Sequence, residues 1–297
     1  MRRYGMLSVC IAIAYGQQPD TLASYHAAFY TGGSSYGDHA RLEVFPLHGK
    51  PFAIPMAFPC QTYYYSPDGE ALYCSSVDGL LKIELRPLRS TLIPGSDVFG
   101  VNSLAVSARE NKIVISGWRK QGGAEERGIF ELNPLSGESR ILAINDKPKI
   151  GNLFPAQSAW QHLAVSPDGK RAVAMRQHTM ELIDLTNGSV RTLSTDLEFG
   201  AWSADGRWLA ALDWRKGHTI LMDASTLTPQ RILRMSDADW SPDSHYLLGV
   251  KTSFLCGPYA GTFQATNVET GKAVTIRSSH CKVKATSGWV SSKIVPE

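Results

Sequence analysis

Two copies of the tripeptide Trp-Arg-Lys, at 118–120 and 214–216, could bind a charged ligand, and Arg176 and His178 lie between them in the chain. An indole ring beside a guanidinium group suits a carboxylate, a phosphate or a sugar acid, and Trp and Arg also dominate the hot spots of protein interfaces. The candidate binding residues are therefore Trp118, Arg119, Lys120, Arg176, His178, Trp214, Arg215 and Lys216. The alternative is that each Trp packs between structural elements while Arg and Lys are hydrated at loop ends.

Motifs for catalysis and for metal binding are weaker. The segment 33–37 matches the Gly-x-Ser-x-Gly elbow of serine hydrolases, but that elbow works only at a strand-to-helix turn of an α/β sheet, so we expect a loop here. The His residues are scattered, with no His-x-His, His-Glu-x-x-His or paired Cys-x-x-Cys, and no phosphate-cradling or dinucleotide-binding loop occurs. We predict no catalytic residue, no metal and no cofactor.

A recurring motif, which we call the repeat phrase, predicts the strands and turns around these residues. It consists of an aromatic or aliphatic residue, then Ser, then Pro or Ala, then Asp, then Gly. Copies begin at Tyr65, Val165, Trp202 and Trp240, with Ser244 in place of the last Gly, and a decayed copy begins at Val106. Their serines are separated by 41, 59, 37 and 38 residues. Three of these steps match the period of about 40 residues of a four-stranded propeller blade, and the step of 59 carries insertions.

The phrase itself predicts a tight hairpin. Pro presets φ at the first turn position, Asp caps the turn, and Gly accepts a positive φ. The repeated Asp residues are thereby explained as turn residues without an acid–base role: Asp68, Asp168, Asp205 and Asp243. In the clearest unit, strands are expected at 171–175, 180–185 and 189–193, and no stretch of the chain has a sustained helical period.

The Ser-Pro-Asp-Gly repeats resemble those of the TolB-like, WD-repeat-like β-propeller family, and the resemblance covers nearly all of residues 17–297. It implies one all-β domain, a six-bladed β-propeller of four-stranded antiparallel blades. The N-terminal segments 24–31, 41–47 and 50–54 read as second, third and fourth strands with no first strand ahead of them, whereas 287–292 matches the opening of the phrase. We therefore expect the C-terminal strand to join the N-terminal blade and close the ring. Seven blades would need an unrecognised repeat inside the 59-residue step.

Counting from the repeat serines brings the candidate binding residues together. Trp118 and Trp214 both lie 11 residues after their repeat Ser, and Arg176 and His178 lie 10 and 12 residues after Ser166. Three consecutive blades would then present these residues at one rim of the ring, where second strands lead to third strands. Long loops on a rigid scaffold are common binding sites.

Residues 1–16 read as a secretory signal: Arg2 and Arg3 precede an apolar run at 6–14, and small residues follow. An uncleaved N-terminus is the alternative. The run is shorter than the roughly 20 residues that span a bilayer, and no later segment is longer, so no transmembrane segment is predicted. We expect a periplasmic or secreted protein.

Four Cys residues remain after cleavage. Cys60 and Cys74 flank the turn at 67–69 and would meet across a hairpin, and Cys256 and Cys281 form the other candidate pair. An oxidising compartment favours disulfides, although four buried free thiols are an alternative.

The charge balance argues against a nucleic-acid partner. The chain has 30 Lys and Arg against 27 Asp and Glu, and the leader holds two of the basic residues, which leaves +1 for the rest. We therefore expect a monomeric, non-catalytic module that binds a protein or a small anionic ligand. Two alternatives stay open: a propeller enzyme with its site in the central funnel, lactonase-like or glycan-active, and an accessory propeller of a prolyl-oligopeptidase-like system. Inward-facing Asp, Glu, Asn or His along the axis would favour the enzyme.

Overall fold

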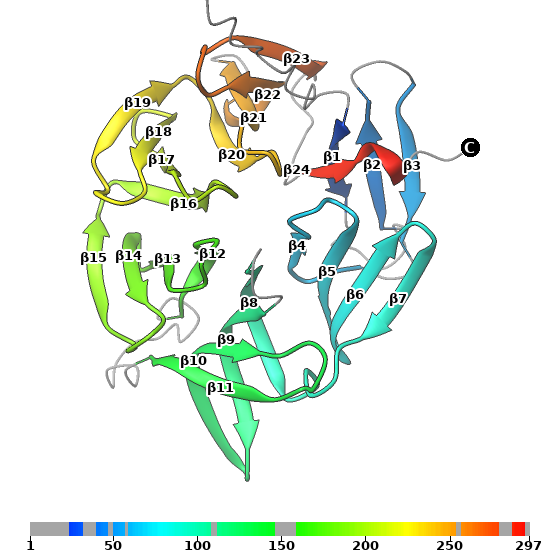
Figure 1. Ribbon diagram of the computed structural model, residues 1–297, viewed down its shortest axis with the longest axis vertical. Coiled ribbons are helices and arrows are strands. Elements are labelled where there is room, and N and C mark those ends of the chain that lie inside the picture. The colour runs from blue at the N-terminus through cyan, green and yellow to red at the C-terminus, as the bar shows by residue number, and fades with distance from the viewer. Residues whose placement is uncertain are drawn as a thin grey trace, which may run out of the picture.

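In the computed structural model the strands form six four-stranded antiparallel sheets arranged as a ring (Figure 1). The structure describes residues 24–31, 40–46, 50–56, 59–107, 112–145, 159–253, 257–278 and 287–294. Besides strands, these residues contain a 3-10 turn at Ser292–Ile294. The chain is thus an all-β, six-bladed propeller, as the repeats predict.

The innermost strand of each blade comes first in the lists that follow. Blade 1 consists of β24 (Ser287–Ser291), β1 (Tyr25–Thr31), β2 (Arg41–Phe45) and β3 (Phe52–Pro55). Blade 2 consists of β4 (Tyr63–Tyr65), β5 (Ala71–Ser76), β6 (Gly79–Leu85) and β7 (Leu88–Leu92). Blade 3 consists of β8 (Phe99–Val106), β9 (Ile113–Gln121), β10 (Ala124–Leu132) and β11 (Ser139–Ile144).

The other three blades follow the same order. Blade 4 consists of β12 (Gln161–Val165), β13 (Arg171–Arg176), β14 (Thr179–Asp184) and β15 (Val190–Ser194). Blade 5 consists of β16 (Leu197–Trp202), β17 (Trp208–Asp213), β18 (His218–Asp223) and β19 (Pro229–Leu233). Blade 6 consists of β20 (Ser236–Trp240), β21 (Tyr246–Ser253), β22 (Gly257–Asn267) and β23 (Ala273–Ser278).

The ring closes through the C-terminal strand, as expected. Strand β24 lies beside β1 (red against dark blue in Figure 1), with Gly288 opposite Ala28. The closing segment is also tied to blade 2, because Ser291 N–H donates to the Gly69 carbonyl at 2.8 Å and Lys293 Nζ lies 3.0 Å from a carboxylate oxygen of Glu70. Closure covers the inner edge of β1 and gives the N-terminal blade its fourth strand.

The repeat phrase forms the turn that its residues predict. In blade 2, Ser66 Oγ donates to Asp68 Oδ1 at 2.5 Å and accepts a hydrogen bond from the Ala71 N–H at 2.8 Å. These two bonds fix the turn between β4 and β5. Ser-to-Asp bonds of 2.6–2.7 Å recur in blades 4, 5 and 6. Ser244, which replaces Gly in the last copy, has φ = 66°. The Asp residues are occupied in turns, which confirms their structural role.

Apolar side chains fill the spaces between the blades rather than a single central core. Among the described residues there is one buried cluster for each pair of adjacent blades. Between blades 3 and 4, for example, Val114 and Ile129 pack with Ala172 and Ile183. Burial of this kind is the main favourable term for folding, and here it leaves the axis to be lined by the innermost strands.

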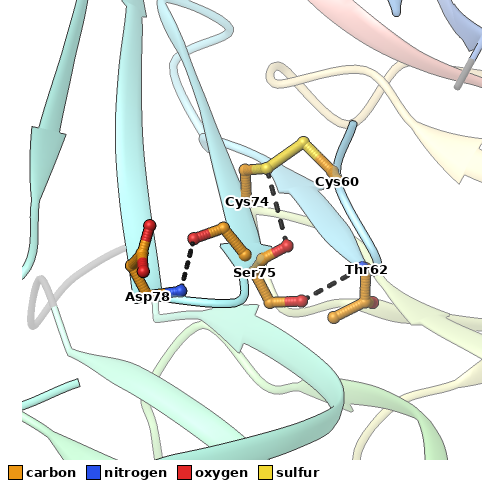
Figure 2. Close-up of a disulfide and its surroundings, with 6 residues drawn as sticks. Cys60, Thr62, Cys74, Ser75 and Asp78 are labelled. Atoms are coloured by element: carbon orange, nitrogen blue, oxygen red, sulfur yellow. Dashed lines mark hydrogen bonds between the residues drawn. A yellow bond between two sulfur atoms is a disulfide. The ribbon is translucent and has the colours of Figure 1, made fainter. Parts of the chain in front are cut away.

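Cys60 and Cys74 form a disulfide, with their Cα atoms 5.3 Å apart (Figure 2). The Thr62 N–H also donates to Ser75 Oγ at 3.1 Å, so the segment before β4 is fixed to β5 both covalently and by hydrogen bonds. Such a bridge is compatible with an exported protein. The second candidate pair, Cys256 and Cys281, lies outside the described residues, as do residues 1–16 and the Gly-x-Ser-x-Gly segment at 33–37.

Candidate functional site

The Trp-Arg-Lys stretches and their partner in blade 4 lie at the end of the ring where second strands lead to third strands. They do not occupy equivalent structures. Residues 118–120 lie within β9, because the β9–β10 hairpin extends to a turn at Gly122 and Gly123, whereas 214–216 form the turn between β17 and β18. Part of the extra length of the 59-residue step therefore lies in the long β9–β10 hairpin.

In blade 3 the rim residues are largely engaged in packing and ion pairs. Trp118 covers Gly100, where an added Cβ would lie 2.0 Å from the indole ring. Arg119 is buried, donates to Glu126 Oε2 at 2.6 Å and stacks 5.1 Å from the centre of the Phe130 ring. The Lys120 ammonium group lies 5.6 Å from the centre of the Trp118 ring.

In blade 4 the rim residue Arg176 is paired, whereas His178 is exposed. Arg176 donates to Glu181 at 2.8 Å and to Asn145 at 3.2 Å, and its guanidinium stacks 4.8 Å from the Trp160 ring. The His178 side chain is 92% exposed and has a carboxylate oxygen of Glu198 at 3.7 Å.

In blade 5 the rim residues project further. Trp214 is 49% exposed, with the Arg215 guanidinium 5.5 Å from its ring centre. Arg215 pairs with Asp196 at 3.2 Å and Lys216 with Asp213 at 3.3 Å. Arg119 and Trp118 therefore have structural contacts that account for them, while a binding role for the rim as a whole stays a prediction.

A cavity of about 520 Å³ runs along the axis of the ring, between the innermost strands. Its polar lining includes Asn102 of β8 in blade 3, His162 of β12 in blade 4 and Asp239 of β20 in blade 6. Aromatic residues share the lining: Tyr63, Tyr64, Tyr65, Trp202, Trp240 and Trp289. We call this cavity the funnel. A mixed aromatic and polar lining in a cavity of this size is typical of a small-molecule site.

β-Bulges give the inner strands irregular registers beside the funnel. The strand pairing skips a residue at Asn102 in β8, and it is interrupted between Gln161 and Ala164 in β12 and between Ser236 and Asp239 in β20. His162 adopts φ = 51° inside its bulge, a left-handed conformation that is unusual for a residue with a side chain. Bulges often re-aim side chains next to binding sites.

Asp239 is the most perturbed carboxyl group of the funnel. Surrounding protein raises its pKa from 3.8 to about 7, although its Oδ1 accepts the Trp240 N–H at 2.9 Å. Burial, with a smaller contribution from the Asp239 carboxyl, also raises the pKa of Tyr64 well above its usual range. Desolvation disfavours the charged form of both groups, so near neutral pH the funnel presents a phenol and a partly protonated carboxyl, both able to donate hydrogen bonds.

Indole N–H groups fix the strands around these two residues. Trp289 Nε1 donates to the Asp239 carbonyl at 3.2 Å, and Trp240 Nε1 donates to the Ala201 carbonyl at 2.9 Å. Blades 5, 6 and 1 are thereby linked at the axis. His162 of blade 4 contacts the neighbouring blade 5, with its imidazole 4.2 Å from the Phe199 ring, and burial lowers its pKa.

The funnel residues were not predicted from the sequence, although the repeat contains a usable signal. Two positions before the repeat Ser, three blades have Ala, at 105, 164 and 201, whereas two others have Tyr64 and Asp239. Where the other repeats have Ala, a polar or aromatic residue indicates that the side chain has a role other than packing within the blade. Among the described residues no three His, Cys, Asp or Glu side chains gather to form a metal site, and no helix is long and apolar enough to span a membrane.

Solved structures with this architecture support the fold. An oligogalacturonate lyase from Vibrio parahaemolyticus matches with a TM-score of 0.56 and 13% identity, over 84% of this chain and 74% of its own. An oligogalacturonate lyase in complex with manganese matches with a TM-score of 0.56 and 15% identity, over 87% and 75%. A TolB candidate from Agrobacterium tumefaciens matches with a TM-score of 0.53 and 17% identity, over 86% and 88%.

No protein-family model and no curated protein sequence matches this chain. At such low identity the structural likeness establishes the architecture and leaves activity open. The chain therefore has a six-bladed β-propeller fold, similar to that of these solved structures.

Proposed function

We propose that this protein is an exported binding module that holds a small carbohydrate-like ligand in its central funnel. The observation that carries the proposal is the funnel lining, in which Trp and Tyr rings alternate with the hydrogen-bonding groups of Asn102, His162 and Asp239. Sugars present apolar C–H faces and a dense set of hydroxyls, so they need both kinds of contact. The volume of about 520 Å³ lies within the range of small-ligand sites.

The state of the polar groups favours a neutral, hydroxyl-rich ligand at the centre of the funnel. Tyr64 keeps its proton at neutral pH because burial raises its pKa, and Asp239 can donate or accept a hydrogen bond near pH 7. Hydroxyl groups match such partners in either direction. The rim residues surround the same end of the axis as His162, and we propose that they contact the parts of the ligand that extend out of the funnel.

Export is supported by two independent features. Residues 1–16 have the composition of a secretory signal, and the disulfide between Cys60 and Cys74 suits an oxidising compartment. A periplasmic or secreted location would also bring the funnel into contact with glycans outside the cytoplasm.

A funnel enzyme is the second candidate, and the titratable groups favour it. The environment raises the pKa of Asp239 towards 7 and lowers that of His162, which is a pattern found in acid–base pairs. Inward-facing Asp, Asn and His were the features expected of the enzyme alternative. The likeness to oligogalacturonate lyases supports a glycan as the substrate class.

A thermal-shift screen with neutral and acidic mono-, di- and trisaccharides tests the proposal, because a ligand that binds the folded state raises the melting temperature by mass action. We expect His162→Ala to abolish the shift caused by the best glycan. His245→Ala is the matched control, since it removes a His in the Asp243 turn of blade 6, outside the funnel and outside the rim. His178→Ala tests the rim separately.

The outcomes separate the alternatives. Loss of binding in the His178 variant alone would move the site to the rim, and the absence of any glycan-induced shift would overturn the proposal. Mass spectrometry of each glycan after incubation detects a changed product, which would assign the funnel to an enzyme instead.

A further inference from the structure

We infer that a second cavity, between blades 3 and 4, is a subsite that takes the acidic group of an elongated ligand whose other end occupies the funnel. This inference rests on the proposed function. The second cavity has a volume of about 210 Å³, and Asn102 lines both it and the funnel. Asn102 sits at the bulge of β8, so the interrupted strand pairing borders both cavities.

The walls of this side cavity are rigid aromatic rings. Trp118 rests on Gly100, and Trp160 is fully buried with its Nε1 donating to Glu181 Oε2 at 2.6 Å. Between them Gly117 and Gly128 face each other across β9 and β10, so no side chain fills the space. Neither glycine tolerates a Cβ, which would lie 2.0 Å and 2.2 Å from the nearest backbone oxygen. The close packing of the strands therefore requires Gly at both positions, and both glycines present backbone atoms to the cavity.

Arg127 supplies the charge. It lies directly opposite Trp118 in the β9–β10 pairing and lines the side cavity. Its Nε donates to Glu125 Oε1 at 2.7 Å, and within the described part of the chain its two terminal nitrogens have no hydrogen-bond partner. These nitrogens can therefore receive a carboxylate, which a guanidinium group binds through two parallel hydrogen bonds.

Within the described part of the chain, Glu125 is the carboxylate that pairs with Arg127, and it does so through Nε. Glu126 is paired with Arg119 and Glu181 with Arg176, so both acids are neutralised by other arginines. Arg176 also holds the Asn145 side chain, which lines the cavity, in place at 3.2 Å. A cation beside two indole rings suits a sugar ring that carries an acid. The ligand class is thus a sugar chain of at least two units with a uronic acid at the end that enters the side cavity.

The test uses linear trisaccharides in pairs, each as the neutral sugar and as the corresponding uronic acid, with binding measured by calorimetry. We expect the wild type to bind the best uronic trisaccharide at least about tenfold more tightly than its neutral counterpart, because hydrogen bonds to a charged group are the stronger ones. Arg127→Gln should remove that preference and leave the affinity for the neutral sugar unchanged. Esterifying the uronic carboxyl groups should have the same effect on the wild type.

Arg140→Gln is the matched control, since Arg140 also pairs with a glutamate, Glu131, on the outer strand of blade 3. It should bind both sugars like the wild type. Equal affinities of the wild type for acidic and neutral trisaccharides, or an unchanged preference in Arg127→Gln, would overturn the subsite while leaving funnel binding intact. If neither trisaccharide of any pair binds, funnel binding itself fails and the subsite with it.

Discussion

Replacing Asp239 by Asn should abolish a pH dependence of stability that the wild type shows. The folded chain holds the Asp239 proton with a pKa of about 7, against an ordinary value of 3.8. Between these two pH values the folded state binds more protons at this site than the unfolded state. The contribution of Asp239 therefore favours folding at low pH and is lost as the pH rises from about 4 to 7.

The size of this effect follows from the two pKa values. They differ by about three, and each difference of one corresponds to about 1.4 kcal/mol, so the upper limit is about 4 kcal/mol. Asp239 is partly exposed to the funnel, and solvent screening reduces the effect, so we expect ~2 kcal/mol. The Asn side chain retains an oxygen that can accept the Trp240 N–H, and the substitution therefore removes the charge without removing that bond.

Urea unfolding of wild type and Asp239→Asn at pH 5 and pH 8 measures the effect, and the difference between the two proteins cancels the titration of all other groups. We expect Asp239→Asn to be the more stable protein at pH 8 and to lose most of that advantage at pH 5. Asp97→Asn, which alters an exposed carboxyl outside the funnel, should show no such change. If the two proteins had the same pH profile, Asp239 would ionise like a surface carboxyl and the funnel would not be the desolvated site described above.

Two further predictions concern the ring and its covalent link. Gly288→Ala should destabilise the ring by roughly 1–3 kcal/mol, because the new Cβ would lie 2.1 Å from the Tyr65 ring. The loss is measured as a lower urea midpoint, and an unchanged midpoint would mean that the closing strand is loosely packed. Cys60→Ser/Cys74→Ser should lower the unfolding free energy by about 3 kcal/mol, since the disulfide closes a loop with a sequence separation of 14. Reductant should destabilise the wild type much more than this double variant, and equal sensitivity would contradict a bridge between these two residues.

The blade architecture was predictable because its determinants are local. The Ser-to-Asp bond of each turn spans two residues, and the Ser-to-backbone bond that follows spans five, so every copy of the phrase forms its own hairpin independently of the rest of the chain. The spacing of the copies then sets the size of a blade. The unmatched strands at the two ends of the sequence similarly predicted the ring closure, which is a matter of counting strands.

The rim shows the limit of such counting. Trp118 and Trp214 have equal offsets from Ser107 and Ser203, but Trp118 lies within β9 whereas Trp214 lies in the turn after β17. The equal offsets gave no information about the extra length of the β9–β10 hairpin. Trp118 of this hairpin lines a cavity, whereas Trp214 is exposed in a turn. Ion pairs such as that of Arg119 with Glu126 depend on which face of the hairpin each residue occupies.

The fold was thus predictable from the chain alone, because short-range hydrogen bonds and a repeated apolar pattern suffice to specify hairpins and blades. The position and lining of the funnel, in contrast, depend on how the blades pack in three dimensions. Tyr64, His162 and Asp239 are far apart in the chain and line one cavity because six blades converge on the same axis. Their altered pKa values arise from the protein packed around that axis, and such desolvation exists only once the ring has closed.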